Sequence, residues 1–221
     1  MIAEERIAQE FESMFTPAEL HADLVPYLTK EFPLDRLQHP LMYAVPYIEQ
    51  MNNHYNRRYE YVKAGVAEAL KEGDFTRYVY THERPYRVNA SIHCIENYRV
   101  SDEEYWELLG SIWGDSENIW QNLADWKRLL RSKRPKRWLF MEEEDRETLK
   151  NLPARLKVYR GCIRGQNENG MSWTLDKDKA RWFSNRLRRK EWTARVLEKE
   201  VPKSRVFAYL SGRGESEVIL L

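Results

Sequence analysis

The chain has 221 residues, of which 42% are hydrophobic and 32% charged, and its formal net charge is +1. This length can bury a core in one or two domains, and the composition is typical of a globular protein rather than a disordered or membrane-spanning one. The nearly neutral charge excludes a global field that would draw the chain onto nucleic acid or a membrane.

The absence of long apolar segments and the number of cysteines indicate the cellular compartment. No apolar run approaches the roughly 18 residues of a membrane-spanning helix, and the acidic start lacks the layout of a signal peptide. The two cysteines, Cys94 and Cys162, are too few for a disulfide framework or for a zinc site of their own. We therefore expect a cytoplasmic protein with no membrane partner and no metal.

Residues 1–100 are predicted to be helical. One helix face is marked by apolar residues at spacings of three and four: Tyr61, Val62, Val66 and Leu70. Because proline removes a donor and clashes inside a helix, the earlier part is expected to form short segments divided by Pro17, Pro26, Pro33, Pro40 and Pro46. Residues 77–95 are ambiguous between strand and loop. The pattern assigns no role to this region.

The next segment is predicted to contain two helices and many tryptophans. Ser101 and Glu104 form a capping box, which starts a helix to about Trp113, and a second helix follows the break at Gly114 and runs to about Arg131. Three tryptophans are spaced seven apart: Trp106, Trp113 and Trp120. They could stack on bases, but an aromatic core between packed helices is the favoured interpretation.

From residue 155 onward the pattern changes to short strands. Residues 156–159, 192–196, 205–209 and 217–220 are predicted to be short strands, and a helix over 176–188 interrupts them. We therefore predict an α+β protein, with a helical N-terminal region followed by a small split β-sheet unit. The expected boundaries are 1–100 and 101–221, the latter with a helical lobe over 101–150 and a β core over 155–221.

Three local motifs in the β core carry candidate chemistry. Tyr159-Arg160-Gly161 ends the first strand, Gly170-Met171-Ser172-Trp173-Thr174 enters a strand before the helix, and Arg213-Gly214-Glu215-Ser216-Glu217 opens the last strand. Taken singly, each has a structural interpretation. Arg160 could be a salt-bridge partner, Ser172 a turn residue, and the two glutamates charges on an edge strand.

The Glu-x-Glu spacing occurs four times in the chain, so it is weak alone. Only the pair Glu215 and Glu217 follows a glycine turn and precedes an apolar strand. Residues two apart in a strand point to the same face, so these carboxylates are expected to crowd each other. Like charges so close are unfavourable unless a ligand or cation uses them. This pair is therefore the catalytic candidate.

In order and local context, the three motifs resemble the arginine–serine–glutamate class of mono-ADP-ribosyltransferases, in particular small phage and bacterial members. The resemblance covers residues 155–221, with a helix after the serine motif, two strands next, and the glutamate motif at the end. It implies an ADP-ribosyltransferase-like fold for 101–221 and NAD as co-substrate. It also implies a host or bacterial protein as acceptor, modified on arginine.

The resemblance further implies residue roles. Glu217 would stabilise positive charge on the ribose as nicotinamide leaves, and Glu215 would orient or deprotonate the acceptor. Arg160 would bind the pyrophosphate or hold the ribose, because a guanidinium fork suits paired oxygens. Ser172 would bond the ribose and orient Glu217, with Thr174 supporting the strand. The remaining cofactor-binding positions are Tyr159, Gly161 and Trp173.

Two alternatives to this activity stay open. One is an NAD glycohydrolase, with water as the acceptor. The other is a non-enzymatic module that binds protein or nucleic acid through the tryptophan-rich helices and two basic clusters: Arg131, Lys133, Arg134, Lys136 and Arg137, and Arg186, Arg188, Arg189 and Lys190. Cys162 has no base beside it in the sequence and is expected to be a packed thiol rather than a nucleophile.

Overall fold

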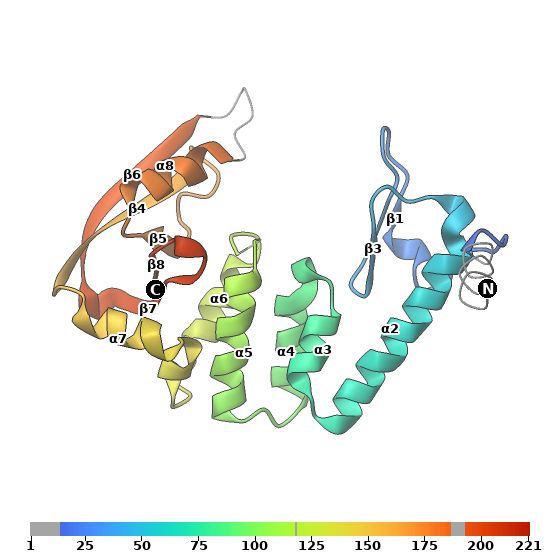
Figure 1. The fold of residues 1–221 in the computed structure, drawn as a ribbon, viewed down its shortest axis with the longest axis horizontal. Coiled ribbons are helices and arrows are strands. Elements are labelled where there is room, and N and C mark those ends of the chain that lie inside the picture. Colours follow the sequence, from blue (N-terminus) through green and yellow to red (C-terminus); the bar gives the residue numbers. More distant parts are fainter. Residues whose placement is uncertain (1–13, 118, 187–192) are drawn as a thin grey trace, which may run out of the picture. The chain divides into compact units, whose positions relative to one another are not determined.

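The structure is a computed structural model that describes residues 14–117, 119–186 and 193–221 (Figure 1). The chain divides into two compact units, Met1–Tyr98 and Arg99–Leu221, and each contains a small antiparallel sheet. The protein is therefore of the predicted mixed α+β class, with helices toward the N-terminus. Among the described residues, no helix combines the length and apolar character needed to span a membrane.

The part of the first unit around residues 28–44 contains a sheet where only helices are predicted. Its strands are β1 (Leu28–Thr29), β2 (Arg36–His39) and β3 (Met42–Ala44), next to the 3₁₀ helix η1 (Val25–Tyr27). The helical prediction for this stretch is wrong. Closely spaced prolines deny it the hydrogen bonds of a helix, so the short segments between them pair as strands instead.

After this sheet, the described residues of the first unit form the helices α2 (Asn52–Glu72), α3 (Phe75–Thr81) and α4 (Arg87–Asn97), with 3₁₀ helices η2 (Glu49–Met51) and η3 (Arg84–Tyr86). α2 ends at Gly73, whose φ is 73°, and Asp74 caps α3 by accepting a hydrogen bond from the Arg77 amide at 2.9 Å. The ambiguous segment is thus helical, because burial of its apolar side chains outweighs weak helix propensity.

The second unit opens with helices, as predicted for residues 101–150, although the first of them continues through Gly114 to Asp115. They are α5 (Asp102–Asp115), α6 (Leu123–Leu130), η4 (Arg137–Phe140) and α7 (Glu143–Asn151). The capping box is confirmed, since the Glu104 amide donates to Ser101 Oγ at 3.2 Å and the Ser101 amide donates to Glu104 Oε2 at 3.0 Å. The aromatic-core interpretation is confirmed for Trp106 and Trp113, which are fully buried, but not for Trp120, which is 51% exposed.

The sheet of the second unit has the order β6-β4-β5-β8-β7. Its strands are β4 (Arg155–Ile163), β5 (Ser172–Thr174), β6 (Ala194–Pro202), β7 (Val206–Leu210) and β8 (Glu217–Leu220), with α8 (Lys177–Arg186), η5 (Lys203–Arg205) and η6 (Gly212–Gly214) between them. All four predicted strands are present, although the first residues of the 192–196 segment lie outside the described chain. One face buries a core of apolar side chains that includes Val158, Trp173 and Val218.

The centre of this sheet is split. β4 pairs with β6 along its whole length, from Arg155 to Ile163. Within the described residues, its register with β5 consists of the single pair Tyr159 and Thr174. From Arg160 onward the two strands therefore separate, and a space opens between the halves of the sheet.

α8 packs across β4 and β6, as Figure 1 shows, and Gly161 is the point of closest approach. A Cβ at Gly161 would lie 2.0 Å from the Ala180 carbonyl oxygen and 2.6 Å from the Ser184 amide nitrogen. Both atoms are backbone, so neither can move aside cheaply. Gly161, predicted as a cofactor-binding residue, therefore has a packing role as well.

Gly161→Ala is expected to destabilise the protein by about 1–3 kcal/mol, because overpacking forces the helix away from the strand. Urea unfolding followed by circular dichroism measures the effect. Gly114→Ala is the matched control, since a Cβ there meets no atom within 4 Å and alanine favours the helix. Equal unfolding midpoints for the two variants would contradict the prediction.

Candidate active site

A cavity of about 270 Å³ lies at the split of the second sheet, lined by β4, β5 and β8 on one side and by α8 and the α5–α6 loop on the other. Its lining contains every site residue predicted from the sequence: Tyr159, Arg160, Gly161, Ser172, Trp173, Thr174, Glu215 and Glu217. The three motifs are distant in the chain, and the strand register brings them together.

Glu217 is the first residue of β8 and lies opposite Thr174 of β5. Its side chain is buried, with 7% of the residue exposed. Carboxylate Oε1 accepts a hydrogen bond from the indole Nε1 of Trp113 on α5, at 3.2 Å. A buried carboxylate needs such donors, because removing it from water is otherwise strongly unfavourable. The cavity thus contains a carboxylate in surroundings that strengthen its electrostatic interactions with a ligand.

Glu215 lies on a turn rather than on the strand. Its backbone angles are helical, with φ −95° and ψ −12°, and Ser216 has a φ of 43° before β8 begins at Glu217. The prediction that the two glutamates share one strand face is therefore wrong. The turn after Gly214 reverses the chain later than the sequence pattern indicates. Glu215 nevertheless lines the cavity, and its carbonyl accepts a 2.6 Å hydrogen bond from Thr174 Oγ1, which holds the turn against β5.

Arg160 lies immediately after the last β4–β5 pair, and its guanidinium bridges the split. Nε and Nη2 donate to the Asn167 carbonyl at 3.1 and 2.9 Å, and Nη1 donates to the Ser172 carbonyl. Gly170 leaves room for this group, since a Cβ there would lie 2.0 Å from Nη2. Burial lowers the pKa of Arg160 below its ordinary value, whereas the nearby carboxylate of Glu217 favours the protonated form. The guanidinium stays charged, because its ordinary value is so high.

The strand register decides which side chains share the cavity face. Tyr159, Thr174 and Glu217 form one row across β4, β5 and β8, so their side chains point to the same side. Ser172 is two residues along β5 and faces the same way, opposite Ile219. Trp173 alternates to the core side, where its Nε1 donates to the Gly170 carbonyl at 3.2 Å. Trp173 therefore packs in the core and also forms part of the cavity lining.

Several cavity residues are not predicted from the sequence. The α5–α6 loop contributes Glu117 and Trp120, and α8 contributes Phe183 and Arg186. Arg186 Nη2 and Glu117 Oε1 lie 3.8 Å apart, so an ion pair joins these two walls. No local pattern distinguishes these side chains. Trp120 was noticeable only as one of the evenly spaced tryptophans.

Most described contacts of the first basic cluster are with side chains of the second unit. Arg134 Nη1 lies 3.1 Å from Asp102 Oδ1, Lys136 pairs with Glu103, and the Arg137 guanidinium lies 5.2 Å from the centre of the Phe207 ring. In the second cluster, Arg188, Arg189 and Lys190 lie outside the described residues. Three of the five cations in the first cluster thus have partners within the second unit.

Neither cysteine has the environment of a nucleophile. Cys162 is buried beside Arg160, burial raises the pKa of its thiol, and its Sγ contacts the Arg195 carbonyl at 3.6 Å. The prediction of a packed thiol is confirmed. In the part of the chain that the structure describes, no three His, Cys, Asp or Glu side chains group as metal ligands would.

Both thiols are expected to resist alkylation in the folded protein. Burial raises the pKa of Cys94 to about 12, so on the order of one part in 10⁴ is thiolate at pH 8, and Cys162 is shielded in the same way. Mass spectrometry after iodoacetamide treatment measures this, with urea-unfolded protein as the fully labelled control. Rapid labelling of native Cys162 would show that the site exposes a reactive thiol.

Comparisons of the chain with protein-family models, with curated proteins and with solved structures each found no match.

Proposed function

We propose that the chain is an NAD-dependent mono-ADP-ribosyltransferase that moves ADP-ribose to an arginine side chain of an acceptor protein and releases nicotinamide. The observation that carries the proposal is that eight residues of three separate motifs line one cavity, which contains a buried carboxylate and a half-buried guanidinium. The element order β5, α8, β6, β7, β8 also agrees with the layout of the enzyme class that the motifs resemble.

Glu217 suits the bond-breaking step. The bond between ribose C1′ and the nicotinamide nitrogen breaks, its electron pair leaves with nicotinamide, and positive charge develops on the sugar. A carboxylate that is already fixed in a buried site stabilises this charge more than it stabilises neutral ribose, which is the difference that accelerates a reaction. The hydrogen bond from Trp113 to Oε1 helps to fix this carboxylate in place.

Arg160 suits a role in NAD binding. A guanidinium has five N–H donors, and its three hydrogen bonds to backbone carbonyls direct it to the split without engaging all of them. The cavity volume of about 270 Å³ is near the lower end of small-molecule sites, which start at about 300 Å³. It therefore suits the nicotinamide-ribose end of NAD, with the remainder extending toward solvent.

The acceptor would approach past Glu215. Its carboxylate lies on the turn before β8 and belongs to a half-exposed residue, so it can meet a protein side chain that enters from solvent. An arginine guanidinium must lose a proton as its nitrogen attacks ribose C1′, and Glu215 is placed to accept it.

Incubation of the protein with NAD labelled in the adenylate part and a bacterial lysate tests the proposal. We expect labelled proteins whose modified residues, located by mass spectrometry, are arginines, together with nicotinamide release. Nicotinamide release without any protein adduct would establish NAD hydrolysis instead. The absence of both would overturn the enzymatic assignment.

A further inference from the structure

Trp113 connects the helical part of the second unit to the candidate catalytic strand. It is fully buried on α5, and its indole Nε1 lies 3.2 Å from Oε1 of Glu217, which is 104 positions away in the chain. An indole nitrogen can only donate. The bond therefore favours the ionised form of the carboxylate, since a carboxylate oxygen accepts more strongly than a protonated carboxyl group.

The direction of this indole is fixed by the aromatic core around it. The Trp113 ring meets the Trp126 ring edge-on, with 4.9 Å between centroids, and the Phe140 ring at 6.2 Å. Phe140 in turn packs at 5.2 Å against Phe207 of β7. Side chains of α5, α6, η4 and β7 all contribute to this packing. The Trp113 ring is therefore held in one orientation, with its N–H directed at Glu217, before any ligand binds.

The serine motif is less well placed for the same task. Ser172 lies opposite Ile219 in the β5–β8 register, two positions from the Thr174–Glu217 pair. Two residues along an antiparallel strand correspond to about 7 Å. Thr174, which is opposite Glu217, uses its hydroxyl to donate to the Glu215 carbonyl and to accept from the Asp176 amide at 3.0 Å.

We propose that Trp113 is a positioning residue, whose indole N–H holds Oε1 of Glu217 and so fixes the direction of this carboxylate in the cavity. The role rests on the proposed function of the site. In this proposal, a residue of α5 orients Glu217, which is the role that the family resemblance implies for Ser172.

Trp113→Phe tests this role, because phenylalanine keeps a buried aromatic ring and removes the donor. We expect kcat for nicotinamide release to fall about 10- to 100-fold, as for the loss of one hydrogen bond to a charged group, while KM for NAD changes little. The acid limb of the pH–rate profile should move to higher pH, because loss of the donor favours the protonated carboxyl group.

Trp126→Phe is the matched control. Trp126 is also fully buried in the same aromatic core, but its Nε1 has no hydrogen-bond partner in the described structure. Both variants lose the same ring atoms, and both keep the charged groups that line the cavity: Arg160, Arg186, Glu117 and Glu215. We expect Trp126→Phe to keep the wild-type kcat and acid limb. If kcat falls equally in the two variants, Trp113 acts only through packing and the proposed positioning role is wrong.

A measurement that does not depend on activity separates this inference from the proposed function. In protein labelled with ¹⁵N-tryptophan, the indole signal that disappears in Trp113→Phe should shift when Glu217 is changed to glutamine. If that signal is unmoved, the contact is refuted whatever the activity. If wild-type protein releases no nicotinamide, the proposed function fails and the positioning role with it. If the wild-type protein releases nicotinamide and Trp113→Phe releases it at the same rate, only the positioning role is overturned.

Discussion

Glu217→Gln is expected to lower nicotinamide release by about 10²–10³-fold or more, because it removes the charge that would stabilise the developing positive ribose. Glutamine has nearly the same shape and retains an oxygen that can accept the hydrogen bond from Trp113. The fold should therefore survive, and the loss should appear mainly in kcat. Nicotinamide release measured by chromatography at saturating NAD, beside a thermal unfolding curve, checks both parts.

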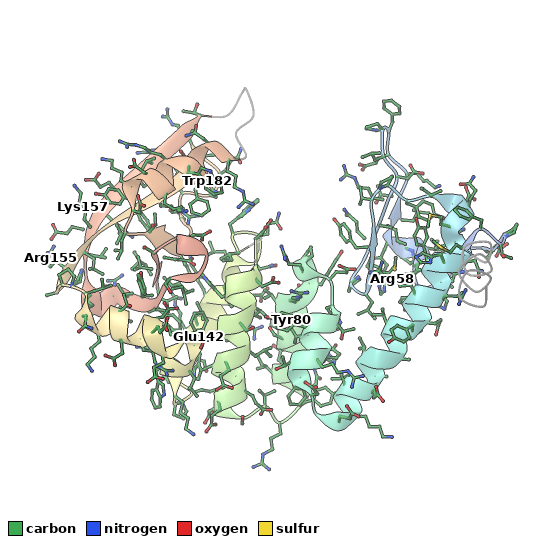
Figure 2. All side chains as sticks on the ribbon, viewed as in Figure 1. Arg58, Tyr80, Glu142, Arg155, Lys157 and Trp182 are labelled. Atoms are coloured by element: carbon green, nitrogen blue, oxygen red, sulfur yellow. The ribbon has the colours of Figure 1, made fainter. Side chains whose placement is uncertain are left out.

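Glu200→Gln provides the control for that variant. Glu200 belongs to another pair with Glu-x-Glu spacing, and its carboxylate lies exposed on β6 at 2.6 Å from the Nε of Arg155. Arg155 and Lys157 point away from β4 in Figure 2, and each pairs with a glutamate of β6. Surface pairs of this kind contribute about 0–1 kcal/mol. Wild-type activity in Glu217→Gln would remove Glu217 from the mechanism.

Arg160→Lys is expected to lower kcat/KM for NAD by about 10²-fold and to destabilise the protein. An ammonium group cannot reproduce the planar fork that reaches the carbonyls of Asn167 and Ser172 together. Each lost charge-assisted bond is worth about 1.5–3 kcal/mol, and a carbonyl left unpaired at the split adds to the effect. Steady-state kinetics and urea unfolding report the two consequences separately.

Gly170→Ala probes the position of the same guanidinium without removing its charge. The added Cβ would lie 2.0 Å from Nη2 and 2.3 Å from Cζ of Arg160, so the side chain must move. We expect a smaller loss of kcat/KM in the same direction. Gly212→Ala, where a Cβ meets no atom within 4 Å, should leave kcat/KM unchanged. If both Arg160→Lys and Gly170→Ala retain wild-type kinetics, Arg160 has no part in NAD binding.

Local signals in the sequence were sufficient for most elements of the second unit. The capping box at Ser101 starts α5, the alternating apolar residues around Val158 form β4, and the apolar run around Val218 forms β8. These features depend on neighbours within a few residues, so a single sequence contains them. Cys162 was predicted to be a packed thiol because no base lies beside it in the sequence, and its burial agrees with that prediction.

Elsewhere, local signals were misleading because distant contacts decided the outcome. Residues 77–95 have weak helix propensity, yet they form α3 and α4, since burial of Val79 and Val88 favours helices there. Prolines were interpreted as breaks between helices, but the segments between them pair as β1, β2 and β3. A turn at Ser216, with its φ of 43°, took Glu215 off the strand that the alternation predicted.

The sequence by itself determined the three motifs, their order and the strands that carry them. Only the tertiary structure decided that they line one cavity, because this depends on the row Tyr159, Thr174 and Glu217 across three strands and on the separation of β4 from β5 after that row. It also decided the partner of Glu217. No local sequence pattern can predict a hydrogen bond between residues 104 positions apart, since the bond arises from the packing of α5 against the sheet.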